Sequence, residues 1–454
     1  MTARLLMIGL DGADGDLIEQ WSSDGSLPHL AALRKRGKTK RLSAPEGITD
    51  DGLWASFQFA CGLGEHGRYY WEQRLASGEM GMSYQDERDR DSFWHTLSRQ
   101  GHRVAIFDIP KCGLPKPLNG IHLSSWIAHG HYLKEPKSYP PILAPEVVRL
   151  FGAAPLRQYG YEMPQFSDEQ VLEIVTDLKA GIVQKRKAGC HFLSTKSWDL
   201  FTIAFKAAHC AGHSLWNFVG SDHPRGHNDY DEQRNIRLGE PLKTVFVELD
   251  AAIGALVAAA GSDAQVVVFS TSDMQQNNTL GHLMPEIISR LNRTLGKQGH
   301  QPYEILPYNG TCAAIQINLP QRRFSWRANR RYRAELLAQA YTILSNLTDA
   351  DTGEPVVTGI DRLSAEQPGK RAAALPNLLL HSSAGAIPRA VISPQLGLIE
   401  APQPTNLRPG DHAAGGLIIS SHGTVDTVNT IQDLGAMAIQ VLQNKTETTA
   451  TVHC

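Results

Sequence analysis

The sequence predicts an α/β protein with a mainly parallel central sheet that helices cover on both faces. Two observations lead to this fold class. Apolar runs without alternation, such as residues 4–12, 198–205 and 264–271, have the pattern of strands buried on both faces. Segments with helical spacing separate these runs, and parallel strands need such long crossover connections. The 42% apolar and 20% charged residues are typical of a globular chain.

Each predicted element rests on a local signal. The first strand ends in Asp-Gly, and the helix after it is followed by a second helix that Gly37 closes. A later helix is closed in the same way by Gly101. The predicted strands cover residues 4–12, 40–45, 102–110, 198–205 and 264–271, and the predicted helices cover residues 16–21, 27–37, 91–101, 168–194 and 242–261.

We expect one catalytic domain over residues 1–445. Residues 111–165 are rich in Pro, Gly, Tyr and His, and we expect them to form an irregular insertion. A second irregular insertion is expected at about 297–410, and the polar residues 446–454 should form a flexible tail.

Composition excludes several classes of function. The net charge of -2 gives no basic field for a nucleic acid polymer. No apolar run approaches the roughly 18–20 residues that span a bilayer, so no membrane partner is expected. The first residues lack the features of a signal peptide, and the 6 cysteines form no Cys-x-x-Cys pair. We therefore expect a cytoplasmic protein with free thiols. The oligomeric state stays open.

Asp11 and three histidines are the candidate metal ligands. Asp11 ends the first strand, where a carboxylate suits a hard or borderline cation or caps the next helix. His209 and His213 have the i, i+4 spacing that places two imidazoles on one helix face; alternatively, they are polar residues at the end of a buried strand. His412 follows a Pro-Gly turn, and the chain contains 18 histidines in all.

Six short motifs follow one another along the chain. They are Gly-Leu-Asp-Gly at 9–12, Leu-Pro-x-Leu-x-x-Leu-x-x-x-Gly at 27–37, ITDDGLWASFQFACGLGEHG at 48–67, His-x-x-x-His at 209–213, STSDM at 270–274, and Gly-Asp-His before an apolar strand at 410–419. In this order they resemble the alkaline phosphatase superfamily, and within it the type I phosphodiesterase/nucleotide pyrophosphatase family. The resemblance covers roughly residues 4–70 and 198–440. It implies an alkaline-phosphatase-like three-layer sandwich with inserted cap segments.

The resemblance also implies the metal sites. One ion, here Zn²⁺, would bind His209, His213 and His412, which requires the ring of residue 412 to lie within about 7 Å of the other two. A second divalent ion, Zn²⁺ or Mn²⁺, would bind Asp11, the nucleophile and an Asp-His pair. In place of that pair this chain carries Thr271 and Ser272, which are poor metal ligands. The second ion is therefore in doubt.

The nucleophile implied by the resemblance is Thr49 or Asp50. Thr49 matches the Thr-Asp of relatives, whereas Asp50 has the usual spacing to Trp54. A hydroxyl next to a metal ion is activated as an alkoxide, and a carboxylate can ligate the metal or attack. We favour Thr49 and leave Asp50 open.

Other residues are candidates for binding substrate or for holding the ligands. His66, Arg68 and Tyr69 follow the segment with the nucleophile; Arg68 would pair with an anionic group, and Tyr69 would stack on a ring or pack in the interior. Three further residues are candidates for hydrogen bonds that hold the metal ligands in place: Asp273, His223 and His282.

These features predict a metal-dependent hydrolase, with zinc, acting on a phosphodiester, a nucleotide pyrophosphate or a related phosphate or sulfate ester. Its partner would be a small-molecule ester, with a nucleotide among the candidates. Two alternatives remain. One is a phosphoryl or sulfuryl transferase, or a mononuclear-metal enzyme of changed chemistry, and the other is a degenerate pseudoenzyme that binds a phosphorylated ligand.

Overall fold

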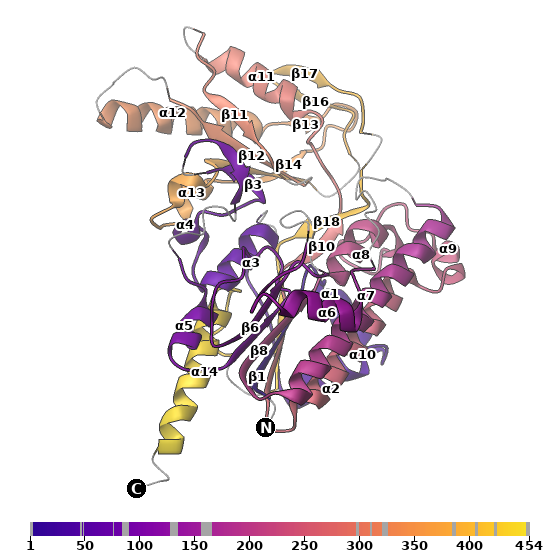
Figure 1. The fold of residues 1–454 in the computed structure, drawn as a ribbon. Helices are drawn as coiled ribbons and strands as arrows, with labels where there is room; N and C mark the ends of the chain where they lie inside the picture. The colour runs from indigo at the N-terminus through magenta and orange to yellow at the C-terminus, as the bar shows by residue number, and fades with distance from the viewer. Residues whose placement is uncertain are drawn as a thin grey trace.

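The computed structural model describes residues 3–45, 48, 50–75, 77–83, 90–127, 135–155, 166–296, 299–308, 311–319, 326–383, 387–404, 407–421 and 425–450. In these ranges a large sheet forms the centre of the molecule (Figure 1). Its inner strands pair in parallel, and antiparallel strands close both edges. The strand order is β2 (Lys38–Arg41), β19 (Leu417–Ser420), β9 (Gln265–Ser270), β1 (Ala3–Leu10), β8 (Trp198–Phe205), β5 (Val104–Phe107), β6 (Gly120–Ser124) and β7 (Lys137–Tyr139).

Helices cover both faces of this sheet, because alternate residues of its strands point to opposite sides. Leu6 and Ile8 of β1 belong to one apolar core, and Leu5 and Met7 belong to the other. The first core packs against α1 (Gly15–Ser23), α2 (Pro28–Arg36), α6 (Leu143–Phe151), α7 (Asp168–Thr195), α8 (Ala207–Leu215) and α10 (Pro241–Ala260); the second packs against α3 (Asp50–Phe59), α5 (Phe93–Arg99) and α14 (Asp433–Ala450). The predicted three-layer α/β fold is confirmed.

A cap lies over one end of the sheet and has its own apolar core (Figure 1). It contains a sheet in the order β11 (Tyr303–Leu306), β12 (Cys312–Ile317), β15 (Leu378–Ser382) and β14 (Val357–Asp361), a smaller sheet of β13 (Thr348–Asp349), β16 (Ala390–Ser393) and β17 (Gly397–Glu400), and the helices α11 (Met284–Leu295) and α12 (Trp326–Leu344). Residues 297–410 were therefore wrongly expected to be irregular. Their strands are short and pair antiparallel within the cap, and such strands leave a weak periodicity in the sequence.

Two further expectations are corrected by the structure. Residues 111–165 contain β6, which joins the central sheet in parallel with β5, and also β7 and α6. The tail expected at 446–454 begins inside α14, which runs to Ala450; residues 451–454 lie outside the described residues.

The remaining elements are short. They are α4 (Leu63–His66), β3 (Glu72–Arg74), β4 (Met80–Met82), η2 (Trp216–Phe218), α9 (Glu232–Arg237), β10 (Asp273–Gln276), α13 (Leu363–Glu366), η3 (Ala372–Ala374) and β18 (Gly410–Ala413). No helix in the described ranges combines the length and the apolar character that crossing a bilayer requires.

Candidate metal centre

The helix α8 presents His209 and His213 on one face. It begins directly after β8, at the carboxyl edge where ligands of parallel sheets bind. The segment is helical, so residues i and i+4 lie one turn apart, and the two ring centroids are 4.4 Å apart. Both imidazoles are buried. The two histidines therefore share one face of a helix, and they are not polar residues at the end of a strand.

The short strand β18 brings His412 to the same place. It pairs antiparallel with β10, with His412 opposite Met274. The centroid of the His412 ring lies 4.8 Å from that of His209 and 4.9 Å from that of His213. One nitrogen from each of the three histidines lies within 4.8 Å of the others, so the donor set fits a single metal ion.

Hydrogen bonds orient two of these rings. His213 Nδ1 lies 2.8 Å from the carbonyl oxygen of Gly410, so this nitrogen carries the proton and donates, which leaves Nε2 as the metal-facing donor. Ser272 Oγ lies 2.9 Å from His412 Nδ1, and His412 Nε2 is buried with no hydrogen-bond partner in the described residues. Burial lowers the pKa of His213 and of His412, so both rings are neutral at neutral pH, as metal ligation requires.

Asp11 lies beside the histidines at the end of β1. Trp54 Nε1 donates to its Oδ1 at 2.7 Å, and its Oδ2 is 3.6 Å from His209 Nδ1. Asp14, and not Asp11, caps the following helix. Gly12 has φ +56 and packs so tightly that a Cβ there would lie 3.2 Å from His209 Cα. Burial and the charge of Asp50 raise the pKa of Asp11 to about 7.

Asp50, the first residue of α3, contacts two of the histidines. Its Oδ1 lies 3.5 Å from His412 Nε2, and its Oδ2 lies 3.6 Å from His209 Nδ1. Two ligand atoms of one tetrahedral zinc ion lie about 3.4 Å apart, so Asp50 is in position to be a fourth ligand or to face the open position. Thr49, the other candidate nucleophile, lies outside the described residues.

A buried lysine, which sequence reasoning missed, completes the cluster. Lys111 Nζ lies 2.6 Å from Asp50 Oδ2 and 2.8 Å from Asp51 Oδ1. Burial disfavours the charged amine, but Asp50, Asp51 and Asp11 outweigh this effect and raise the pKa of Lys111. Burial likewise opposes the ionisation of Asp50, and the Lys111 ammonium outweighs it and lowers the pKa of Asp50. The only sequence signal was the position of Lys111, just past a strand end.

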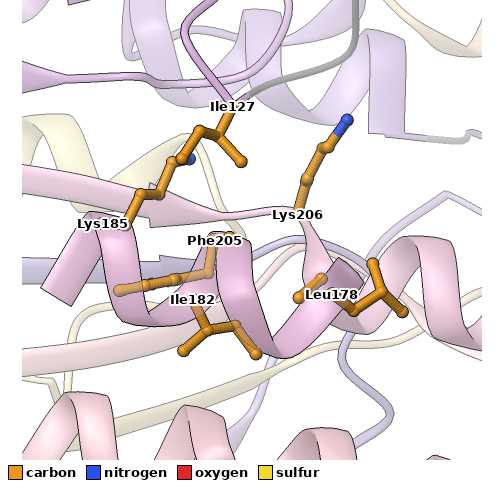
Figure 2. Close-up of a pocket in the computed structure, with 8 residues that line it drawn as sticks. Ile127, Leu178, Ile182, Lys185, Phe205 and Lys206 are labelled. Atoms are coloured by element: carbon orange, nitrogen blue, oxygen red, sulfur yellow. The ribbon is translucent and has the colours of Figure 1, made fainter. Parts of the chain in front are cut away.

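A second buried lysine anchors the turn that carries Lys111. Lys185 Nζ lies 2.8 Å from Asp108 Oδ2 and donates to the carbonyl of Ala204 at 2.6 Å. Figure 2 shows its amine reaching toward Ile127, whereas the amine of Lys206 points away. The cavity between these side chains has a volume of about 10 Å³, which holds one water molecule at most. It is a packing gap and not a ligand site.

Thr271 and Ser272, which the resemblance places at the positions of the Asp-His pair, lie between β9 and β10, and Asp273 follows them. The Thr271 hydroxyl donates to Asp11 Oδ1 and accepts from the backbone N–H of Gly12, both at 3.3 Å. Ser272 contacts His412, as described above. The Asp273 carboxylate accepts from the backbone N–H of Gly15 and forms ion pairs with Arg41 and Arg225. Asp273 therefore forms its ion pairs with the guanidinium groups of Arg41 and Arg225 and not with the imidazole cluster.

Two of the three candidate substrate residues line a cavity of about 370 Å³. His66 and Arg68 line it together with Arg371. His66 Nδ1 accepts from the Arg68 N–H, so its Nε2 donates to Ser56 Oγ at 2.9 Å. Tyr69 is fully buried and stacks on Tyr308, which agrees with the second of its two predicted environments, packing in the interior. An aromatic motif alone does not distinguish these two environments.

The two other candidates for holding the metal ligands in place differ. His223 Nε2 lies 3.0 Å from Asp14 Oδ1, and both residues are buried. Asp14 Oδ2 in turn accepts from the backbone N–H of Met274 in β10, and Met274 pairs with His412 of β18. Through Asp14, His223 therefore supports the strand that pairs with the one carrying His412. His282 Nε2 instead donates to the carbonyl of Pro388 in the cap.

The fold and the site define an α/β protein with an imidazole–carboxylate cluster at the carboxyl edge of its sheet. The chain belongs to the type I phosphodiesterase/nucleotide pyrophosphatase family, whose sequence profile matches residues 5–395. The predicted family is thereby confirmed, and the protein is a hydrolase of the phosphodiesterase/nucleotide pyrophosphatase type. The family is metal-dependent.

Solved structures with the same fold are distant in sequence. Phosphonoacetate hydrolase from Sinorhizobium meliloti 1021, in complex with phosphonoformate, has a TM-score of 0.55 at 12% identity, covering 97% of this chain and 96% of that chain. Murine ectonucleotide pyrophosphatase/phosphodiesterase 5, an inactive variant in complex with AMP, has a TM-score of 0.51 at 14% identity, covering 97% and 95%. At this identity the likeness concerns the fold. No curated protein sequence matches the chain significantly.

Proposed function

We propose that this protein is a zinc-dependent hydrolase of a small phosphodiester, nucleotide pyrophosphate or related phosphate or sulfate ester. The observation that supports this most strongly is the convergence of His209, His213 and His412, from two distant segments, on one point at the carboxyl edge of the sheet. Three imidazoles around an open position are a donor set that catalytic zinc prefers.

A bound zinc ion would polarise a phosphoryl oxygen and lower the pKa of a coordinated hydroxyl. The protein itself orients the groups that would bind the ion. Gly410 and Ser272 hold two of the imidazoles, and Trp54 holds the Asp11 carboxylate in the same cluster. The nucleophile would be Thr49, or Asp50 with its carboxylate beside the imidazoles.

The substrate class is supported by the ligands named with the structural relatives. Phosphonoformate and AMP are both small and carry a phosphonate or phosphate group. In this chain we assign His66 and Arg68 to substrate binding, because both line the cavity of about 370 Å³ and Arg68 carries the positive charge that an anionic ester requires. We also propose a cytoplasmic location, which the free thiols of Cys61 and Cys190 support.

The experiment combines metal analysis with an ester assay. We expect purified wild-type protein to contain zinc by plasma mass spectrometry and to hydrolyse bis(4-nitrophenyl) phosphate. His213→Ala should lose the metal and at least about 100-fold of kcat/KM, because a ligand is lost. His191→Ala removes an exposed histidine on α7 and should match the wild type.

Wild-type protein that is free of metal after growth in zinc-supplemented medium would contradict this proposal. The same assay, run with 4-nitrophenyl phosphate, 4-nitrophenyl sulfate and ATP, ranks the ester classes. Thr49→Ala and Asp50→Asn then distinguish the two nucleophiles: the variant that abolishes turnover while retaining zinc identifies the attacking group.

A further inference from the structure

We propose that the ammonium group of Lys111 takes the place of a second metal ion, so that this chain binds a single divalent cation. The inference rests on the proposed metal site at His209, His213 and His412. It adds that the neighbouring carboxylates are neutralised by the chain's own cation.

The carboxylate cluster is dense and buried. Asp11, Asp50 and Asp51 are each at most 4% exposed. Such groups stay charged only when a cation compensates them. Lys111 Nζ supplies that cation at 2.6 Å from Asp50 and 2.8 Å from Asp51, and it also stabilises the charge of Asp11.

The donors that a second ion needs are already engaged. Thr271 and Ser272 offer only neutral hydroxyls, which bond to Asp11 and to His412. Asp11, Asp50 and His209 do bring three ligand atoms within 4.8 Å. However, His209 also belongs to the imidazole site, and the Asp50 oxygen nearest to His209 is the one that pairs with Lys111. Lys111 and a second ion would therefore compete for Asp50.

Lys111 already brings a positive charge to this buried cluster, at 2.6 Å from Asp50 and 2.8 Å from Asp51. A second divalent cation would have to lie beside that ammonium group, and two like charges in a buried site repel each other strongly. Lys111 therefore opposes a second ion through its charge as well as through its contact with Asp50.

The backbone holds Lys111 in place at an energetic cost. Lys111 has φ +60 and Asp108 has φ +55, in the left-handed region that side chains disfavour. The Asp108 carboxylate accepts from the N–H groups of Trp126 and Ile127 and pairs with Lys185, which fixes the start of the turn. Because strain of this kind persists only where neighbouring contacts impose it, the turn directs Lys111 into the carboxylate cluster.

The test counts metal ions in the whole protein. Wild-type protein, dialysed against excess ZnCl₂ and then freed of unbound metal, should hold one ion per chain by plasma mass spectrometry and native mass spectrometry. Two ions per chain would overturn this inference and leave the proposed function intact. No ion at all would overturn both.

Variants of Lys111 then test the cause. Lys111→Met removes the charge with little change in volume, and it should raise the count from one ion to two, because the freed Asp11, Asp50 and Asp51 cluster gains an affinity for Zn²⁺. Lys111→Arg and the exposed control Lys38→Met should both stay at one. A count that stays at one in folded Lys111→Met contradicts the inference.

If Lys111→Met does not fold, the wild-type and Lys111→Arg counts still decide the question. Lys111→Arg retains the positive charge, so two ions in this variant would show that a cation at this position does not exclude the second ion. Circular dichroism and thermal unfolding, measured with and without ZnCl₂, establish which variants are folded.

Discussion

At the residue scale, the metal centre depends on side chains that hold the ligands as much as on the ligands themselves. The carbonyl of Gly410 is the partner of His213, and the hydroxyl of Ser272 is the partner of His412. Such contacts set the orientation of each ring, so that the other nitrogen faces the metal position. In this chain Ser272 therefore has a supporting role, although a serine is itself a poor zinc ligand.

Ser272→Ala should weaken zinc binding about 10- to 100-fold, because His412 loses the contact that holds its ring. Competition titration with a fluorescent zinc chelator measures the dissociation constant directly. The control is Ser393→Ala, which removes another buried serine, from β16 in the cap. Equal zinc affinity in Ser272→Ala and the wild type would exclude the orienting role of Ser272.

At the element scale, the site exists because α8 and β18 approach each other very closely. Gly410 of β18 faces the backbone of α8, and a Cβ at Gly410 would lie 2.2 Å from the carbonyl oxygen of Gly212. No real contact between these atoms is that short, so only glycine allows this approach. The same approach brings the carbonyl of Gly410 to His213 and His412 to both histidines of α8.

Gly410→Ala should move β18 away from α8, lower the free energy of unfolding by about 1–3 kcal/mol, and weaken zinc binding. Urea unfolding and zinc titration measure the two effects. Gly359→Ala is the matched control, because that strand glycine has room for a Cβ, whose nearest neighbour is His381 Cδ2 at 3.4 Å. A Gly410→Ala variant with wild-type zinc affinity would show that the close approach is not needed.

At the scale of the whole molecule, we expect the stability of the central sheet to depend on pH, because the sheet buries a titratable histidine. His122 lies in β6 and is buried, and its Nδ1 has no hydrogen-bond partner in the described residues. Burial, with a smaller contribution from His95, lowers the pKa of His122 from 6.5 to about 3. The unfolded chain therefore binds a proton between these pH values that the folded chain does not bind.

The stability contributed by neutral His122 should be complete above pH 6.5 and should fall as the pH is lowered toward 3, by about 2 kcal/mol between pH 7 and pH 5. Urea unfolding in EDTA, across this range, measures it without metal binding. His122→Gln cannot titrate, so its stability should fall less steeply than that of the wild type. Parallel pH profiles for the two proteins would contradict the assignment.

The features that could be predicted from the sequence are local ones. The apolar runs of β1, β8 and β9 identify the parallel sheet, because a strand buried on both faces requires apolar side chains in succession. The i, i+4 spacing of His209 and His213 places both side chains on one helix face, because residues four apart lie about one helical turn apart. The order of short motifs was sufficient to identify the family.

The remaining features were decided by tertiary structure, because they depend on contacts between distant segments. Lys111 follows a strand and carries no motif, and only the turn after β5 places its amine among the carboxylates. Tyr69 belongs to a motif, yet packing against Tyr308 of the cap places its ring in the interior. Periodicity and spacing depend on residues that are close in the sequence, so they predict helices, strands and shared faces. A metal centre depends on charged and polar side chains from distant segments, and only the tertiary structure brings these together.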